Sequence, residues 1–245
     1  LKAEYERFSA AAGLPTAPER LQAAGLSRAL KADGTLEMPQ PAGTLTDSGG
    51  NLDIEKARRS YSSYLDTLTE APERTMVWLR YFTEKNPTEY VKDDMLDAPF
   101  AYDSAEDRIL YNPSHPQFST IDFEMANTHE LAHRTDVLNM HGYRSQGFTD
   151  AIADASKFVF ANTDIFQRLA KSVQSDLLKD ILSALSSGQL NTGFGHKVEY
   201  WTGSPDAAPM EIFAELFTME TQNDSDLYII KKIFPDLWKE YQKLF

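Results

Sequence analysis

The chain has 245 residues, of which 42% are hydrophobic and 11% are aromatic, so it can bury a sizeable core. Its 37 acidic residues outnumber 24 lysines and arginines, and the resulting net charge of −13 argues against a nucleic-acid partner or an anionic membrane surface. No cysteine is present, which excludes disulfides and thiolate metal sites, and no apolar run reaches the length of a membrane span. Any metal site must therefore use His, Asp, Glu and water.

The first 50 residues are expected to form a helical segment and a linker arm ahead of one domain, 51–245. Two short helices are predicted before Ala32. The stretch 33–50 is rich in Gly, Pro, Ser and Thr, which predicts an extended arm. The alternative is an ordered loop packed on the domain through the apolar residues Leu36, Met38 and Leu45. The chain starts at Leu1 rather than Met, which favours a piece of a larger polypeptide or a processed chain.

Helical spacing returns after Asn51. A first helix is predicted from the apolar positions Ile54, Ala57, Tyr61, Tyr64, Leu65 and Leu68. Pro72 lies where the first turn of a second helix would start. That second helix carries an apolar stripe expected to pack in the core, made of Met76, Val77, Leu79, Tyr81 and Phe82.

A short hairpin is predicted next. The runs Pro99–Tyr102 and Arg108–Tyr111 flank a polar turn, Asp103–Asp107. The segment from Arg108 to Asn112 is expected to be an edge strand, to which an extended peptide could add through backbone hydrogen bonds. His115 lies between two prolines, which indicates a surface loop.

The sequence Thr128-His129-Glu130-Leu131-Ala132-His133 is the strongest chemical signal in the chain. Its helix is expected to begin near Thr120, whose hydroxyl can cap it. On a helix His129 and His133 project from one face about one turn apart, the separation at which two imidazoles can share a zinc ion. Glu130 stands beside that ion, where its carboxylate could take a proton from water. The pattern predicts one zinc ion per chain, with Glu130 as general base.

Asp136 lies on the same helix face as both histidines, three residues after His133 and seven after His129. It could be a third metal ligand. The short spacing fits better with a carboxylate that orients a ligand imidazole without touching the metal. His141, just beyond the helix, is expected to be a solvated loop residue.

The second half of the chain is expected to be helical. Three helices are predicted between Phe148 and Leu185, the last ending at Gly188. The glycine- and aromatic-rich segment Gly193–Gly203 lacks the third glycine of a nucleotide-binding loop and is predicted to be a flexible active-site loop.

A further helix, Ala207–Phe217, carries Glu211 and Glu215 on one otherwise apolar face. Two carboxylates on such a face need a positive partner, because burying an unpaired charge is costly. A zinc ion bound by two neutral histidines is a suitable one.

These motifs carry a family resemblance. His129–Asp136 and Glu211–Phe217 are similar to the H-E-x-G-H-x-x-D and E-x-F-A-E-x-F pair of gluzincins of the anthrax-lethal-factor type, and Phe234–Trp238 continues the likeness. Further segments resemble the zincin-like domain of phage minor head (head morphogenesis) proteins and related bacterial toxin modules; they are Phe8–Leu26, Tyr90–Val91, Pro99–Tyr102 and Ile109–Pro113.

The resemblance implies a zincin-like α+β fold, mainly α, with a small sheet beside the active-site helix. It implies a zinc metallopeptidase acting on a protein or peptide, associated with a virion or delivered as a toxin. His129, His133 and Glu211 would hold the zinc, with Glu215 behind them; Glu215 or Asp136 stays open as third ligand. The family's oxyanion-binding tyrosine corresponds to Ser204 here, so Tyr200, the nearest tyrosine, is the candidate. The alternative function is a structural virion or delivery component with little turnover.

Overall fold

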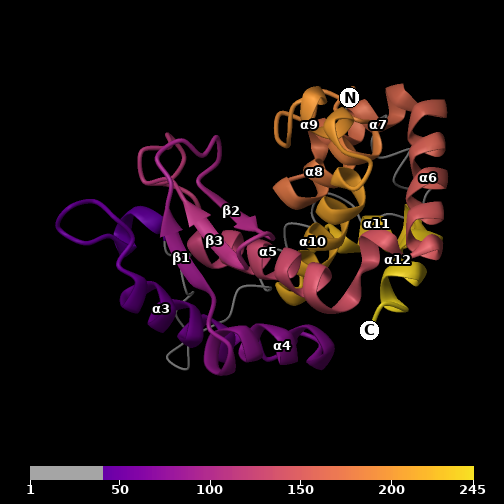
Figure 1. Ribbon diagram of the computed structural model, residues 1–245. Coiled ribbons are helices and arrows are strands. Elements are labelled where there is room, and N and C mark those ends of the chain that lie inside the picture. Colours follow the sequence, from indigo (N-terminus) through magenta and orange to yellow (C-terminus); the bar gives the residue numbers. More distant parts are fainter. Residues whose placement is uncertain (1–40) are drawn as a thin grey trace. The chain divides into compact units, whose positions relative to one another are not determined.

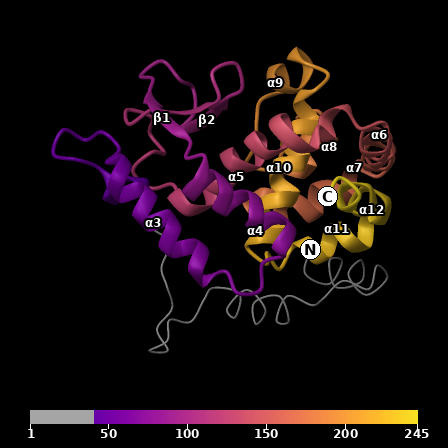
Figure 2. The same ribbon diagram turned by 60° about the horizontal axis from the view of Figure 1, so that its bottom comes forward.

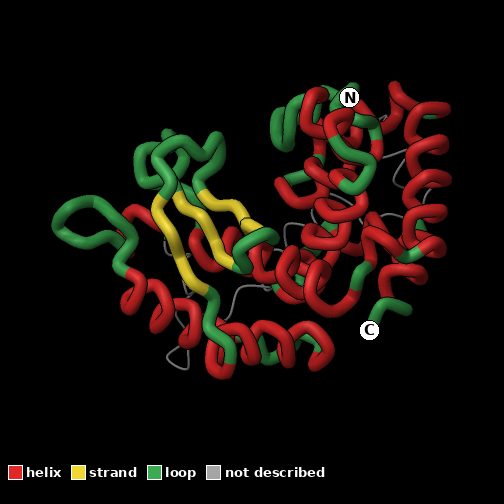
Figure 3. The backbone as a smooth tube through the Cα atoms, in the orientation of Figure 1, coloured by secondary structure: helices red, strands yellow, loops and turns green. Residues whose placement is uncertain are grey.

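The computed structural model describes residues 41–245, which divide into two compact units, 41–137 and 138–245. Among these residues the fold is α+β and mainly helical, with ten α-helices and one three-stranded mixed sheet (Figure 3). The fold class predicted from the sequence is confirmed at this level. The two helices expected before Ala32, and the anchors Leu36 and Met38, lie outside the described residues.

The first unit, 41–137, holds the sheet and three of the helices (Figure 1). Its elements are α3 (Ile54–Thr67), α4 (Glu73–Arg80), a π-helical turn (Tyr81–Lys85), β1 (Glu89–Lys92), β2 (Phe100–Asp103), β3 (Arg108–Tyr111) and α5 (Phe123–Thr135). Helix α5, which carries both histidines, packs against β2, α3 and α4.

The sheet has the strand order β1-β3-β2. The predicted hairpin is confirmed, because β2 and β3 pair antiparallel with Phe100 opposite Tyr111 and Asp103 opposite Arg108. Strand β1, which the sequence analysis missed, pairs with β3 in parallel. The prediction that Arg108–Asn112 forms an edge strand is therefore wrong: β3 is central, and β1 and β2 are the edges. A parallel partner comes from a separate segment, so a local hairpin pattern cannot reveal it.

The apolar stripe of the second predicted helix is only partly buried. Met76, Leu79 and Phe82 lie in the core, whereas Val77 and Tyr81 are 56% and 44% exposed. The prediction of core positions for Val77 and Tyr81 is wrong: Val77 lies on α4, Tyr81 begins the π-helical turn that follows it, and these two residues, four positions apart, share an outward face.

The described part of the N-terminal arm is an ordered loop that contains a short 3-10 helix, Ala42–Leu45. The backbone N–H of Ala42 donates to the carbonyl of Ile121 at 2.9 Å, and that of Asp53 donates to the carbonyl of Leu45 at 2.8 Å. Leu45 itself is buried. Residues 41–50 thus follow the alternative expectation, in which an apolar anchor holds the loop on the domain.

Helix α5 begins later than predicted. Its N-cap is Asp122, whose carboxylate accepts the backbone N–H of Met125 at 3.0 Å, and Thr120 precedes the helix. Two residues of α3 hold α5 in place: the Tyr61 hydroxyl lies 2.9 Å from the Thr128 hydroxyl, and Ser60 donates to Glu124 at 2.9 Å. These two contacts fix the rotation of α5 about its axis, and therefore the direction in which His129 and His133 point.

The second unit, 138–245, is helical throughout its described elements (Figures 1 and 2). These are α6 (Gln146–Ala161), α7 (Thr163–Ser172), α8 (Asp176–Leu185), α9 (Val198–Gly203), α10 (Ala207–Thr221), α11 (Leu227–Ile233) and α12 (Pro235–Gln242). The three helices predicted between Phe148 and Leu185 are confirmed as α6, α7 and α8. Helix α10 packs on α8, and α12 packs on α6. Between residues 41 and 245 there is no helix with the length and apolarity needed to cross a membrane.

Candidate metal centre

His129 and His133 form a pair on one face of α5, as predicted. Their Nε2 atoms lie 3.0 Å apart, and their rings meet edge to face with centroids 4.6 Å apart. Two nitrogens bound tetrahedrally to zinc at about 2.0–2.1 Å would lie roughly 3.3 Å apart. The pair is within a few tenths of an ångström of that separation, so the two imidazoles fit a shared metal ion.

The Glu130 carboxylate is held at the edge of the sheet. Its Oε2 accepts the backbone N–H of Tyr102 in β2 at 2.7 Å. The backbone N–H of Asn112 donates to the carbonyl of Pro99, so Pro99 and every second residue after it form hydrogen bonds to the β3 side of the hairpin. The backbone of Tyr102 therefore points away from β3, toward Glu130. The catalytic role of Glu130 stays a prediction.

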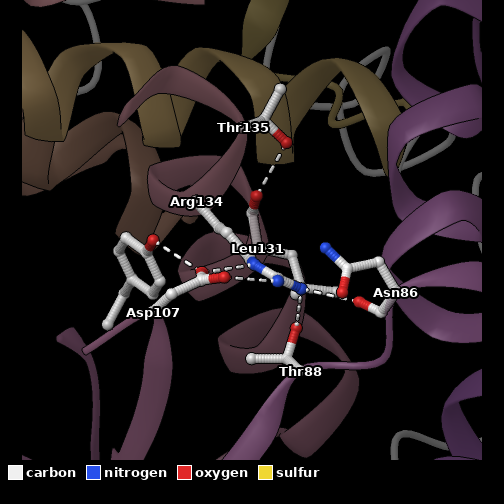
Figure 4. Close-up of polar contacts among 7 residues, drawn as sticks. Asn86, Thr88, Asp107, Leu131, Arg134 and Thr135 are labelled. Carbon is white, nitrogen blue, oxygen red and sulfur yellow. Dashed lines mark hydrogen bonds and ion pairs between the residues drawn. The ribbon is translucent and has the colours of Figure 1, made fainter. Parts of the chain in front are cut away.

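Arg134, the residue after the second histidine, is almost fully buried and ties α5 to two other segments (Figure 4). Its guanidinium makes two bonds of 2.7 Å to the carboxylate of Asp107, in the β2–β3 turn. It also donates to the carbonyl of Asn86 at 2.8 Å and to the hydroxyl of Thr88 at 2.7 Å, just before β1. One buried cation thus ties the helix that carries His129 and His133 to the β2–β3 turn and to the segment before β1.

Asp107 links this cation to Tyr102. It has a left-handed backbone, φ 51°, and its carboxylate accepts the Tyr102 hydroxyl at 2.9 Å as well as the Arg134 guanidinium. The hydrogen bonds from Arg134 lower the pKa of Asp107, and burial raises the pKa of Tyr102. Tyr102 is consequently held at both ends, by Glu130 at its backbone and by Asp107 at its hydroxyl.

Asp136 follows the last residue of α5 and is fully buried. Its backbone N–H bonds to the carbonyls of Ala132 and His133. The structure therefore keeps Asp136 beside the histidine helix, and its role as ligand or as orienting carboxylate stays a prediction. His115 lies in the turn before α5 and His141 is exposed, as expected for loop histidines.

Glu211 and Glu215 lie one turn apart on α10 in the second unit and are only 4% and 3% exposed. The prediction that these two carboxylates lie on an otherwise apolar helix is confirmed, because nearly every residue of α10 is buried. The Tyr200 hydroxyl, on α9, donates to Oε1 of Glu211. The structure thus brings Tyr200 to Glu211, whereas Ser204 lies at the end of α9. The roles of Tyr200, Glu211 and Glu215 stay predictions.

The segment Gly193–Gly203 combines glycine turns with helix α9. Gly193 and Gly195 have positive φ values of 73° and 101°. A Cβ built on Gly195 would overlap Oδ1 of Asp180 on α8, so glycine is needed there for both conformation and space. The loop is therefore fitted closely against α8 at this point.

Sequence reasoning missed several residues of these clusters. Arg134 and Asp107 stand 27 residues apart and carry no local signal that they pair. Tyr102 contacts Glu130 through its backbone N–H, which any residue except proline could supply. Neither Asp180 nor His196 was assigned a role; the glycine just before His196, Gly195, was the signal that the backbone comes close to another element there.

The predicted site residues fall in both units: His129, Glu130, His133 and Asp136 in 41–137, and Tyr200, Glu211 and Glu215 in 138–245. Their joining on one ion is a proposal. No protein-family model, no curated protein and no solved structure matches this chain. Its function is therefore inferred from the chemistry of these side chains.

Proposed function

We propose that this protein is a zinc-dependent peptidase with a zincin-like fold. The observation that carries the proposal is the histidine pair on α5, with Nε2 atoms 3.0 Å apart, next to a glutamate held at the sheet by a backbone N–H. Paired imidazoles alone are compatible with any zinc site. The adjacent carboxylate adds a proton acceptor, which hydrolysis requires.

In this proposal His129 and His133 each supply a neutral imidazole nitrogen and Glu211 supplies a carboxylate oxygen to one zinc ion per chain. Three protein ligands leave a coordination position open for chemistry. Asp136 and Glu215 act behind the ligands, Asp136 by orienting an imidazole. When bound, the zinc supplies Lewis acidity, which polarises a carbonyl group and lowers the pKa of water.

Glu130 is the proposed general base. An ionised carboxylate only accepts hydrogen bonds, and the Tyr102 N–H occupies one of its oxygens, Oε2. The other oxygen is oriented by this bond and takes the proton from the attacking water. The same carboxyl group then returns a proton to the leaving amine.

Strand β2 is the proposed docking edge for an extended peptide. It lies at the edge of the sheet and packs against α5. The ladder alternation that turns the Tyr102 backbone outward does the same for Phe100, so the carbonyls of both residues face the side where a peptide strand can add. Such pairing reads the backbone of the substrate rather than its side chains.

Tyr200 is the proposed oxyanion donor. Its hydroxyl donates to Glu211 in the structure, which keeps a neutral donor beside a proposed zinc ligand. On substrate binding the hydroxyl would turn toward the developing negative charge on the carbonyl oxygen. Replacing Tyr200 with Phe should therefore lower turnover more than substrate affinity.

The test compares wild type with Glu130→Gln, using metal analysis and proteome-wide cleavage profiling of the same samples. We expect both proteins to bind zinc and the variant to lose about 100-fold or more of its hydrolytic rate, since the proton acceptor is gone. Glu220→Gln is a matched control, because Glu220 is a buried glutamate that belongs to neither the motif nor the proposed ligand set. Wild type without zinc, or a Glu130→Gln variant as active as wild type, would contradict the proposal.

The same samples decide the alternative, a virion or toxin-delivery component with a structural zinc site. In that case zinc removal unfolds the protein and no peptide is cut by wild type. The resemblance to phage head and toxin modules fits either role. Cleavage by wild type, together with its loss in Glu130→Gln, would exclude the structural role.

A further inference from the structure

A second cluster of metal-binding side chains lies wholly inside the unit 138–245. Asp180 on α8, His196 in the loop after Gly195, and Glu211 on α10 each bring one ligand atom within 4.8 Å of the other two. Neither Asp180 nor His196 has a role predicted from the sequence. We propose that this cluster is a second divalent-cation site, separate from the histidine pair of α5.

The donor set suits a divalent cation. Nε2 of His196 lies 3.6 Å from Oε1 of Glu211, close to the roughly 3.4 Å between two tetrahedral zinc ligands. Asp180 and Glu211 are 3% and 4% exposed. Buried carboxylates are typically paired with positive charge or bound to metal, and one imidazole with two carboxylates favours Zn²⁺, Co²⁺ or Mn²⁺ over Ca²⁺.

The surrounding chain presents His196 to the two carboxylates. Its ring stacks on Tyr200 with centroids 3.9 Å apart and an interplanar angle of 15°. The indole N–H of Trp201 donates to the carbonyl of His196 at 3.1 Å and to the Ser183 hydroxyl at 3.2 Å, which fastens the loop to α8. The site is therefore built by three elements rather than by one exposed loop.

Gly195 gives an independent sign of close fit. Any side chain there would overlap Asp180 and press on Ser183, so the loop backbone lies directly over the aspartate. A bound cation would fasten this loop to α8 and α10 together. Because His196 stacks on Tyr200 and Glu211 accepts the Tyr200 hydroxyl, the cation would also set the position of Tyr200.

This inference goes beyond the proposed peptidase, although both use Glu211. The experiment is a Co²⁺ titration of the full chain, followed by calorimetry and by the visible absorption of bound Co²⁺. We expect two equivalents to bind wild type and one to bind the double variant His129→Ala/His133→Ala. In that double variant, Asp180→Asn or His196→Gln should weaken the remaining site by about tenfold or more.

Two control variants match these changes. Asp176→Asn alters an acid on the same helix α8, and His115→Gln alters a loop histidine in the other unit. Both should leave Co²⁺ affinity unchanged. His196 is 39% exposed, so its replacement should preserve the fold even if Asp180→Asn does not; circular dichroism checks both.

The inference is overturned if wild type binds one equivalent and the His129→Ala/His133→Ala variant binds none, in which case the peptidase site can still stand. It is also overturned if His196→Gln leaves the affinity of the double variant unchanged, which would make the cluster an internal ion pair. Failure of the peptidase proposal would be seen in a separate measurement, as a rate of hydrolysis that Glu130→Gln leaves unchanged.

Discussion

The ion pair between the buried Arg134 and Asp107 allows a quantitative test of how helix α5 is held. Replacing Asp107 with Asn keeps the size of the side chain and suits a left-handed backbone, but it removes the charge opposite Arg134. Arg134 is 2% exposed and makes two bonds of 2.7 Å to this carboxylate. The guanidinium would remain buried with one acceptor oxygen in place of a carboxylate.

The expected cost follows from burial and screening. Removing one partner of a fully buried ion pair costs about 3–5 kcal/mol. Asp107 is 41% exposed and Asn retains one acceptor, so the expected loss is about 2 kcal/mol. For a protein of this length the melting temperature should fall by roughly 4–8 °C. Denaturant unfolding and calorimetry measure both quantities.

A surface ion pair serves as the control. Arg80 and Asp66 meet at 3.0 Å with side chains 42% and 68% exposed, so Asp66→Asn should change stability by about 0.5 kcal/mol or less. The reasoning is refuted if Asp107→Asn costs no more than Asp66→Asn.

The pH dependence of the free energy of unfolding tests the same ion pair. Because Arg134 lowers the pKa of Asp107 below its usual 3.8, the stability that Asp107 contributes is present above about pH 4. It is lost as the pH falls further, through the pKa of the folded state. The difference between wild type and Asp107→Asn should shrink in that range. A difference that stayed constant under acid would place its origin elsewhere.

Two further predictions concern the unit 138–245. Gly195→Ala should destabilise the protein by more than Gly193→Ala, measured by thermal melts. Both glycines have positive φ, but only Gly195 lies against Asp180. Equal losses would show that backbone strain alone sets the loss of stability. Asp224→Asn should raise the free energy of unfolding at pH 7 by about 0.5 kcal/mol or more and change it little below pH 4. The reason is that burial raises the pKa of Asp224, so its ionisation above pH 3.8 opposes folding; a variant less stable at pH 7 would count against this.

Local patterns predicted much of the secondary structure correctly. Helical spacing located α3, α6 and α8 because a buried helix face imposes its period on the sequence. The hairpin β2–β3 was readable because its turn is short and polar. The pairing of His129 and His133 also followed from spacing, since the geometry of a helix alone sets the distance between positions four apart.

Tertiary structure decided what joins segments that are distant in the chain. The parallel strand β1 makes β3 central and leaves β1 and β2 as the edges of the sheet. Arg134 contacts Asp107, and Glu130 contacts the backbone of Tyr102, only because α5 packs against the hairpin. His196 meets Asp180 and Glu211 only once α8 and α10 are side by side. The sequence by itself determined the chemical groups and their local spacing, whereas packing determined their partners, because a side chain's contacts across the fold leave no period in the sequence.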